Sequence, residues 1–283
     1  MERTNKLYVV GTLTEVDLRP GKTRSGDDFI AGNIKVAVSD DNILDMSFFA
    51  TKLTKDGNPN ARYSNYSSLE GFLNKRVKVS GEIQGRVFYS RNVGQVINFN
   101  ELSAGFINLA TEKDANTATY EFSGFVHRAL VEKTNKEGQV YAHEIEVGQA
   151  DYSGDRLSVV KFQVMPDQAN IINSIGSRYQ KGMTIAFNGE VVYQNKTETR
   201  TEEVAFGDPI VKTFTSVQKN FLITGGKEPI MGGTAYTAEQ ISRLGNAYNE
   251  YVLDVEAKAK EGAQDTGSAG NASPAKTSVN ALI

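Results

Sequence analysis

Basic and aromatic side chains alternate in three short stretches of the first 110 residues. A cation can pair with a phosphate and an aromatic ring can stack on a base, so this mixture suits contact with a single strand of nucleic acid. In chain order the residues are Arg19, Lys22 and Arg24, then Phe49, Lys52, Arg62, Tyr63 and Tyr66, then Arg86, Phe88, Tyr89 and Arg91.

A thinner set of the same residue types lies in the second part of the chain. It comprises Arg128, Lys133, Lys136, Lys161, Tyr193 and Lys196. Each aromatic residue could equally belong to a core, and strand alternation puts Phe48 and Phe49 on opposite faces. We assign Phe48 to the core and Phe49 to the surface. We also expect the first set to bind more tightly and the second to extend the site or form an oligomer contact.

The chain lacks the residue patterns of most enzymes and metalloproteins. It has no cysteine and two histidines, which excludes thiol nucleophiles and zinc ribbons. The sequence Gly21-Lys22-Thr23 is not a phosphate-binding loop, because the required earlier glycine is replaced by Val16. We therefore expect no enzyme activity, no metal site and no cofactor.

Composition places the chain among ordinary globular proteins. It has 283 residues, 39% of them hydrophobic and 23% charged, and a net charge of −3. No apolar run reaches the roughly 18–20 residues that a membrane helix needs, and the N-terminus has no long apolar segment of the secretory type. We expect a cytoplasmic protein that does not enter a membrane.

A faint internal repeat organises the elements that must position these side chains. Two strand-like runs contain a central glycine, Gly11 and Gly124, and two later runs contain a Gly-Glu pair. The first copy has predicted strands at 7–16, 29–38, 43–50, 76–88 and 96–102, a loop at 19–28 and a helix at 66–75. The second copy has the matching strands at 120–130, 140–147, 157–164, 182–193 and 219–224, a loop at 132–139 and a helix at 168–180. Gly11 to Gly81 spans 70 residues and Gly124 to Gly189 spans 65, so the spacing agrees as well.

Each copy is predicted to contain five strands with one helix between the third and fourth, which is the order of an OB-fold. The predicted class is all-β with a minor helix: two tandem OB-fold (five-stranded Greek-key) barrels, at 1–110 and 111–226. Mid-strand glycines suit the sharp coiling of a small barrel. In this fold the basic and aromatic residues fall on the strand 1–2 loop, the region from strand 3 to the helix, and the strand 4–5 hairpin. Those are regions through which OB-folds bind.

The remaining residues are predicted to form a linker and amphipathic helix at 227–261, followed by a disordered tail at 262–283. Thr237 and Gln240 have the spacing of a capping box, and apolar residues recur at helical spacing from Ile241 to Ala259. The apolar stripe could pack on the second barrel or on another chain, and we favour the second barrel.

Several segments resemble the single-stranded DNA-binding protein family. The first strand contains a Gly-x-Leu-Thr motif at Gly11–Thr14, and the strand after each helix resembles the family's fourth strand, at Asn74–Gly81 and more faithfully at Lys181–Gly189. Two copies in one chain are typical of divergent or phage-encoded versions. The resemblance implies sequence-independent binding of single-stranded DNA, with replication or recombination proteins as further partners, and a monomer or homodimer in the cytoplasm, that of the host if the protein is phage-encoded.

Two other functions stay open on the sequence. The barrels could bind protein instead, as a structural or adaptor subunit of a replication or transcription machine. RNA is not distinguished from DNA, because stacking surfaces serve both polymers.

Overall fold

The strands follow from alternation of apolar and polar residues. In β2 (Asp28–Ser39), Ile34 and Val36 are fully buried, whereas Asn33 is exposed. Beta-branched residues of this kind pack well on a pleated surface.

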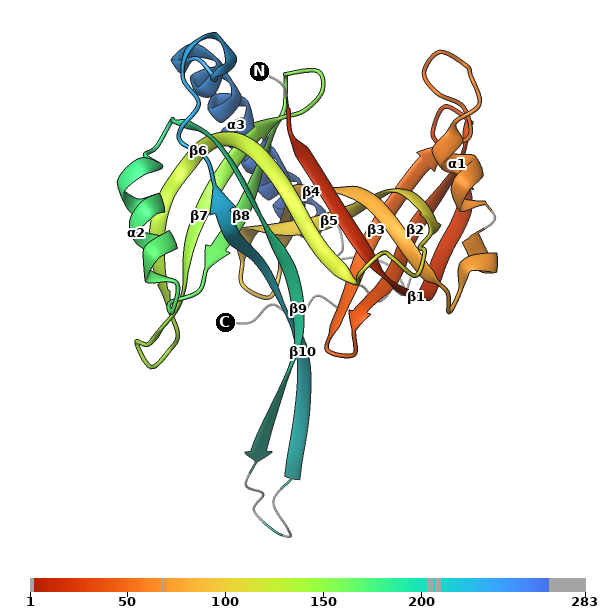
Figure 1. The fold of residues 1–283 in the computed structure, drawn as a ribbon, viewed down its shortest axis with the longest axis horizontal. Coiled ribbons are helices and arrows are strands. Elements are labelled where there is room, and N and C mark those ends of the chain that lie inside the picture. The colour runs from red at the N-terminus through yellow and green to blue at the C-terminus, as the bar shows by residue number, and fades with distance from the viewer. Residues whose placement is uncertain (1–2, 68, 203–205, 207–209, 265–283) are drawn as a thin grey trace.

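The structure is a computed structural model that describes residues 3–67, 69–202, 206 and 210–264 (Figure 1).

The two halves of the chain contain the same elements in the same order. The first half has β1 (Asn5–Lys22), β2, β3 (Asn42–Thr51), α1 (Ala61–Tyr66), the 3-10 turn η1 (Leu69–Phe72), β4 (Arg76–Ser90) and β5 (Gln95–Leu109). The second half has β6 (Thr117–Thr134), β7 (Val140–Ala150), β8 (Leu157–Val164), α2 (Ala169–Arg178), β9 (Thr184–Glu202) and β10 (Ile210–Gly226); the 3-10 turn η2 (Gly232–Thr234) and α3 (Ala238–Gln264) follow. The predicted class, mostly β with a C-terminal helix, is confirmed.

Each half closes its five strands into a ring. In the first half β1 pairs with β2 and β4, β2 with β3, and β4 with β5, all antiparallel, while β3 and β5 meet in parallel. In the second half β6 to β10 repeat these pairings. Both rings, which lie side by side in Figure 1, are compatible with the predicted pair of OB-folds.

An antiparallel seam between β1 and β6 joins the rings into one ten-stranded sheet. Leu7 pairs with Gly81 on β4, and Tyr120 pairs with Gly189 on β9, so Leu7 and Tyr120 hold equivalent places. These two residues also pair with each other across the seam. A pseudo-two-fold axis through this pair therefore relates the two halves.

Contacts away from the seam follow the same axis. The Asn42 side chain at the start of β3 accepts a hydrogen bond from the backbone N–H of Tyr193 on β9, at 2.9 Å. At the equivalent places, the Ser158 hydroxyl at the start of β8 accepts one from the N–H of Gly85 on β4, at 2.8 Å. Each half thus holds the β4–β5 or β9–β10 hairpin of the other.

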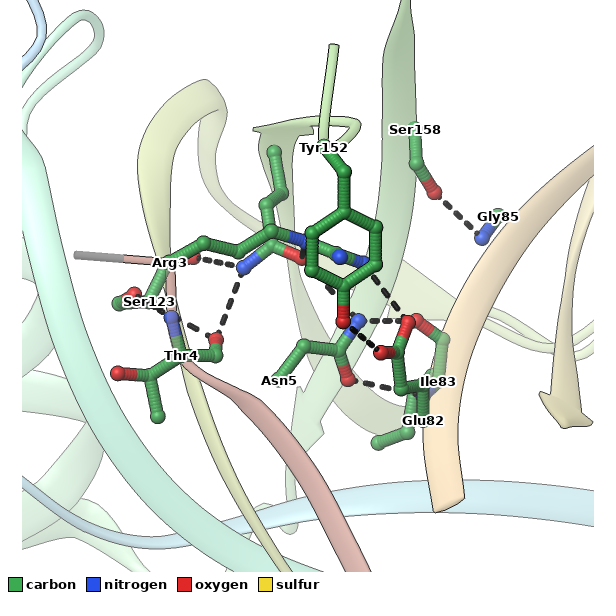
Figure 2. Close-up of polar contacts among 10 residues, drawn as sticks. Arg3, Thr4, Asn5, Glu82, Ile83, Gly85, Ser123, Tyr152 and Ser158 are labelled. Atoms are coloured by element: carbon green, nitrogen blue, oxygen red, sulfur yellow. Dashed lines mark hydrogen bonds and ion pairs between the residues drawn. The ribbon is translucent and has the colours of Figure 1, made fainter. Parts of the chain in front are cut away.

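A partly buried polar network fastens the N-terminal segment to both halves (Figure 2). The Asn5 amide exchanges two hydrogen bonds with the backbone of Ile83, at 2.8 and 2.9 Å. Arg3 forms an ion pair with Glu82 at 2.8 Å, and its guanidinium lies 3.9 Å from the ring centroid of Tyr152. Segments far apart in the chain are therefore held together near the seam.

Close backbone approach explains two of the predicted mid-strand glycines. A Cβ atom at Gly11 would lie 2.3 Å from the carbonyl oxygen of Ala37, and one at Gly124 would lie 2.4 Å from that of Gly148. Any side chain here would separate the first two strands of its ring.

The first predicted helix and the predicted strand 1–2 loops are wrong in detail. The helix expected at 66–75 lies at Ala61–Tyr66 and begins five residues earlier than expected, because the Asn60 side chain caps it at the N–H of Arg62. The second helix lies within its expected range. The basic residues expected in loops lie largely on strands, since pairing of β1 with β2 continues to Lys22 and β6 runs to Thr134.

The C-terminal helix packs on the second half, as predicted, and it also contacts β4 and β5 of the first half. Thr237 and Gln240 form the reciprocal capping box, with hydrogen bonds of 2.9 and 3.2 Å. Leu244 is 1% exposed and forms a separate cluster with Phe125, Leu157 and Val159. The tail expected from 262 lies outside the described residues from 265 onward.

Candidate nucleic-acid interface

Two neighbouring aromatic rings occupy the outer face of β1, β2 and β3, which we call the first-half face. Phe49 on β3 is 53% exposed, and its ring centroid lies 5.3 Å from that of Phe29 on β2. Gly21 on β1 pairs with Phe29 and lets its ring lie close, because a Cβ atom there would be 2.5 Å from the ring. The assignment of Phe48 to the core is confirmed, since it is 2% exposed.

Cationic side chains lie on the same strands as this pair of rings and at the ends of those strands. Arg19 on β1 lies on the same face as Phe49 on β3, because both pair with Ala31 of the intervening strand β2. Lys22 lies at the end of β1, and Arg24 is exposed in the turn that follows. Lys52 follows β3 and is 3.7 Å from Asp28. Three of the four predicted cations thus come from one hairpin and the fourth from the neighbouring strand end.

These cations are partly neutralised by exposed carboxylates. Lys22 lies 2.8 Å from Asp28, and their hydrogen bond lowers the pKa of Asp28 and raises the pKa of Lys22. Arg19 lies 3.2 Å from Asp17. Such exposed ion pairs contribute little to folding, so a phosphate group can replace the carboxylate at small cost.

The residues predicted on α1 belong to the core instead. Tyr66 is 3% exposed and stacks on Phe48 at 3.5 Å, so its ring offers no face to a base. Arg62 donates to the carbonyl oxygen of Ala104 at 2.9 Å, and its guanidinium lies over the Phe48 ring. Tyr63 packs against the same cluster. The prediction for Tyr66 is therefore wrong: α1 covers the end of the first ring, and its large side chains fill that end.

The β4–β5 hairpin divides its predicted residues between two sides. Phe88 meets Phe99 edge to face at 5.4 Å, and Arg86 lies 2.6 Å from Glu101. Tyr89 faces the other side, since neighbours on a strand alternate. Arg91 is exposed at the tip.

The second half has a weaker version of this surface. Arg128 lies 3.3 Å from Glu144 and 2.5 Å from Glu146, and Lys133 lies 3.4 Å from Glu144. Lys161 donates to the carbonyl oxygen of Asn98 at 3.0 Å. Lys136 and Lys196 are exposed.

Two further features reduce the second-half surface. By the strand pairings, Val140 holds the place of Phe29 and Met165 the place of Phe49. The second half therefore lacks the pair of aromatic rings. Tyr193 is 2% exposed, so the expectation of a stacking surface there is wrong. Asn42 of β3 hydrogen-bonds to the backbone of Val191 and Tyr193, so the first half lies against this part of β9.

A groove of about 740 Å³ lies between the halves, and we call it the axial groove. Asp45 of β3 and Lys161 of β8, which hold equivalent places in the two halves, both line it. Its walls also contain Phe88 and Phe99 from the β4–β5 hairpin and Tyr193 from β9. The groove is thus composed of both halves.

Burial in this groove raises the pKa of Asp45 above its ordinary value of 3.8, although Lys219 and Lys35 oppose the shift. The folded state then binds the proton more tightly than the unfolded state, and stability is lost as the pH rises through the folded pKa. We expect Asp45→Asn to be more stable than the wild type at pH 7, with the difference disappearing below about pH 3.8. Urea denaturation of both proteins at pH 7 and pH 3.5 tests this. A variant with the same stability as the wild type at pH 7 would contradict it.

Sequence reasoning missed two aromatic residues of this surface, Phe29 and Phe99. Alternation could have identified Phe29, because it shares a face with Asn33 while Ile30 and Ile34 point inward. The position of Phe99 could not be identified in this way, because it depends on the register of the β4–β5 hairpin, which places Phe99 opposite Arg86.

Among the described residues, no group of three or more His, Cys, Asp or Glu side chains could hold a metal ion. In the same part of the chain, no helix is both long and apolar enough to cross a membrane.

Comparisons with known proteins give the following matches. Crystal structures of the wild-type single-stranded DNA binding protein from Thermus aquaticus and of a deletion mutant of it align with 84% of this chain and with 99% and 100% of theirs, at 14% identity and TM-scores of 0.49 and 0.48. No curated protein matches the sequence. The YorF family model matches residues 3–258, so the chain belongs to the YorF family.

Proposed function

We propose that the chain binds single-stranded DNA without sequence preference through the first-half face and protects it during replication or recombination. The pair formed by the exposed Phe49 and the half-buried Phe29, with cations on the same strands and at their ends, carries the proposal. Stacking accepts every base, and cations bind phosphates whatever the sequence, so the arrangement suits a strand whose bases are unpaired.

The proposal assigns unequal roles to the halves, which we take as OB-folds at 1–110 and 111–226. The first half supplies rings and cations. In the second half, Glu144 and Glu146 neutralise Arg128 and Lys133, and α3 covers part of the outer face. One strong binding face per chain follows from this asymmetry, and we take the protein to be a cytoplasmic monomer or homodimer.

Fluorescence-anisotropy titration of a labelled 30-mer oligo-dT at several salt concentrations tests the function. If Arg19, Lys22, Arg24 and Lys52 each neutralise one phosphate, a plot of the logarithm of the association constant against the logarithm of the salt concentration should have a slope of about −3. Oligo-U and duplex DNA are the controls. Equal binding of oligo-U would make the ligand single-stranded nucleic acid in general. Absence of oligo-dT binding at low salt would favour a protein-binding adaptor instead.

A further inference from the structure

The axial groove contains two buried polar atoms without a hydrogen-bond partner among the described residues. They are Oδ1 of Asp45 and the hydroxyl of Tyr193. The Tyr193 side chain is at least nine-tenths buried, and both residues line the groove. Buried polar groups are nearly always hydrogen-bonded in folded proteins, so two such groups at one groove indicate a ligand with a complementary polar edge.

The groups around these two atoms indicate the chemistry of that ligand. A carboxylate accepts hydrogen bonds and a phenol can donate one. The Watson–Crick edge of every base presents a donor beside an acceptor. Phe88 and Phe99 supply apolar aromatic surface in the same groove. The three lysines of its lining, Lys35, Lys161 and Lys219, outnumber its two carboxylates, Asp45 and Glu144. A flat, polar-edged base attached to phosphates fits this combination better than a free anion does.

The groove also continues the first-half face. Asp45 lies on β3 four residues before Phe49 and on the same side of the strand, which corresponds to about 13 Å along it. Lys35 pairs with Asp45 from β2. A strand stacked on Phe49 would need only a few nucleotides to reach the groove.

We propose that the axial groove receives one base of the bound strand, with its face on the Phe88–Phe99 pair and its edge on Asp45 and Tyr193. The inference rests on the proposed function. The flexible side chain of Lys219, which lies over the Tyr193 ring at 5.1 Å, moves aside to admit the base. Because any base offers a donor and an acceptor, the site detects a base without selecting its identity.

Tyr193→Phe tests the proposal with the smallest structural change. The hydroxyl has no hydrogen-bond partner within the described part of the chain, so its removal should leave the urea midpoint unchanged or higher. Affinity for the 30-mer oligo-dT should fall by about 2- to 10-fold, as expected for one lost hydrogen bond. Affinity for a 30-mer of abasic deoxyribose phosphates, which has the same charge and no bases, should not change.

Tyr66→Phe is the matched control, because Tyr66 is similarly buried and its hydroxyl also has no partner among the residues that the structure describes, yet it lies outside the groove. This variant should bind both strands like the wild type. As a second variant, Phe99→Ala should weaken oligo-dT binding by roughly 5- to 150-fold, as for a lost stacking contact, and spare the abasic strand.

The outcomes separate this inference from the proposed function. If the wild type binds oligo-dT and Tyr193→Phe binds it equally tightly, or loses affinity equally for both strands, the base site is wrong and the first-half face stands. If the wild type does not bind oligo-dT, both are overturned.

Discussion

Replacing Phe49 by alanine is expected to weaken binding of a 30-mer oligo-dT by about 5- to 150-fold, because a base stacked on an aromatic ring contributes about 1–3 kcal/mol. The ring is 53% exposed and lies outside the core that Phe48 occupies, so the fold should persist. The slope of affinity against salt should stay that of the wild type, since no charge is removed. Anisotropy titration at several salt concentrations measures both quantities.

Tyr251→Ala is a matched control for this experiment. Tyr251 is 50% exposed on α3, so the substitution removes a similar amount of exposed aromatic surface away from the first-half face. Its affinity for oligo-dT should equal that of the wild type. Equal affinities of the two variants, with both unfolding midpoints unchanged, would show that no base stacks on Phe49.

Alternation explains which parts of this surface could be predicted from sequence. A strand has a period of two, so the assignment of Phe48 to the core and Phe49 to the surface needed only neighbouring residues. The same rule reaches Phe29. By contrast, Tyr66 is buried by stacking on Phe48, a contact that depends on how α1 closes the ring. Local pattern contains no information about that closure.

The axial groove lies further beyond sequence reasoning. Its walls meet because the β1–β6 seam fixes the two halves relative to each other with Leu7 against Tyr120. Tyr193 contributes to this groove beside Asp45 of the first half, and Asn42 of the first half accepts a hydrogen bond from its backbone N–H. A repeat can be detected in the sequence, whereas the orientation of its copies is a property of their contact.

Gln149→Leu is expected to destabilise the protein by about 2–4 kcal/mol, because this side chain connects three segments near the seam. Gln149 is 1% exposed on β7. Its amide nitrogen donates to the carbonyl oxygens of Thr4 and Ser123, at 2.8 and 2.6 Å. Its amide oxygen accepts from Arg3 and Asn5, at 2.9 and 3.1 Å. Leucine has a similar volume and makes none of these bonds, each of which contributes about 1 kcal/mol net.

The loss should be large because Arg3 is itself mostly covered. Its side chain is 20% exposed, and without Gln149 its Nε would lose the acceptor that it has in the wild type. A charged group left without a partner costs more than an average hydrogen bond. The network in Figure 2 would then hold Arg3 through Glu82 and Tyr152 alone among the contacts described here.

Gln95→Leu makes the same chemical change at an exposed position at the start of β5, where the structure gives the side chain no hydrogen bond within the described residues. Surface substitutions of this kind usually change stability by about 0.5 kcal/mol or less. Urea denaturation followed by circular dichroism compares the two variants with the wild type. A loss below about 1 kcal/mol for Gln149→Leu would mean that the seam is held by its strand pairing and apolar core, and that the N-terminal segment contributes little to joining the halves.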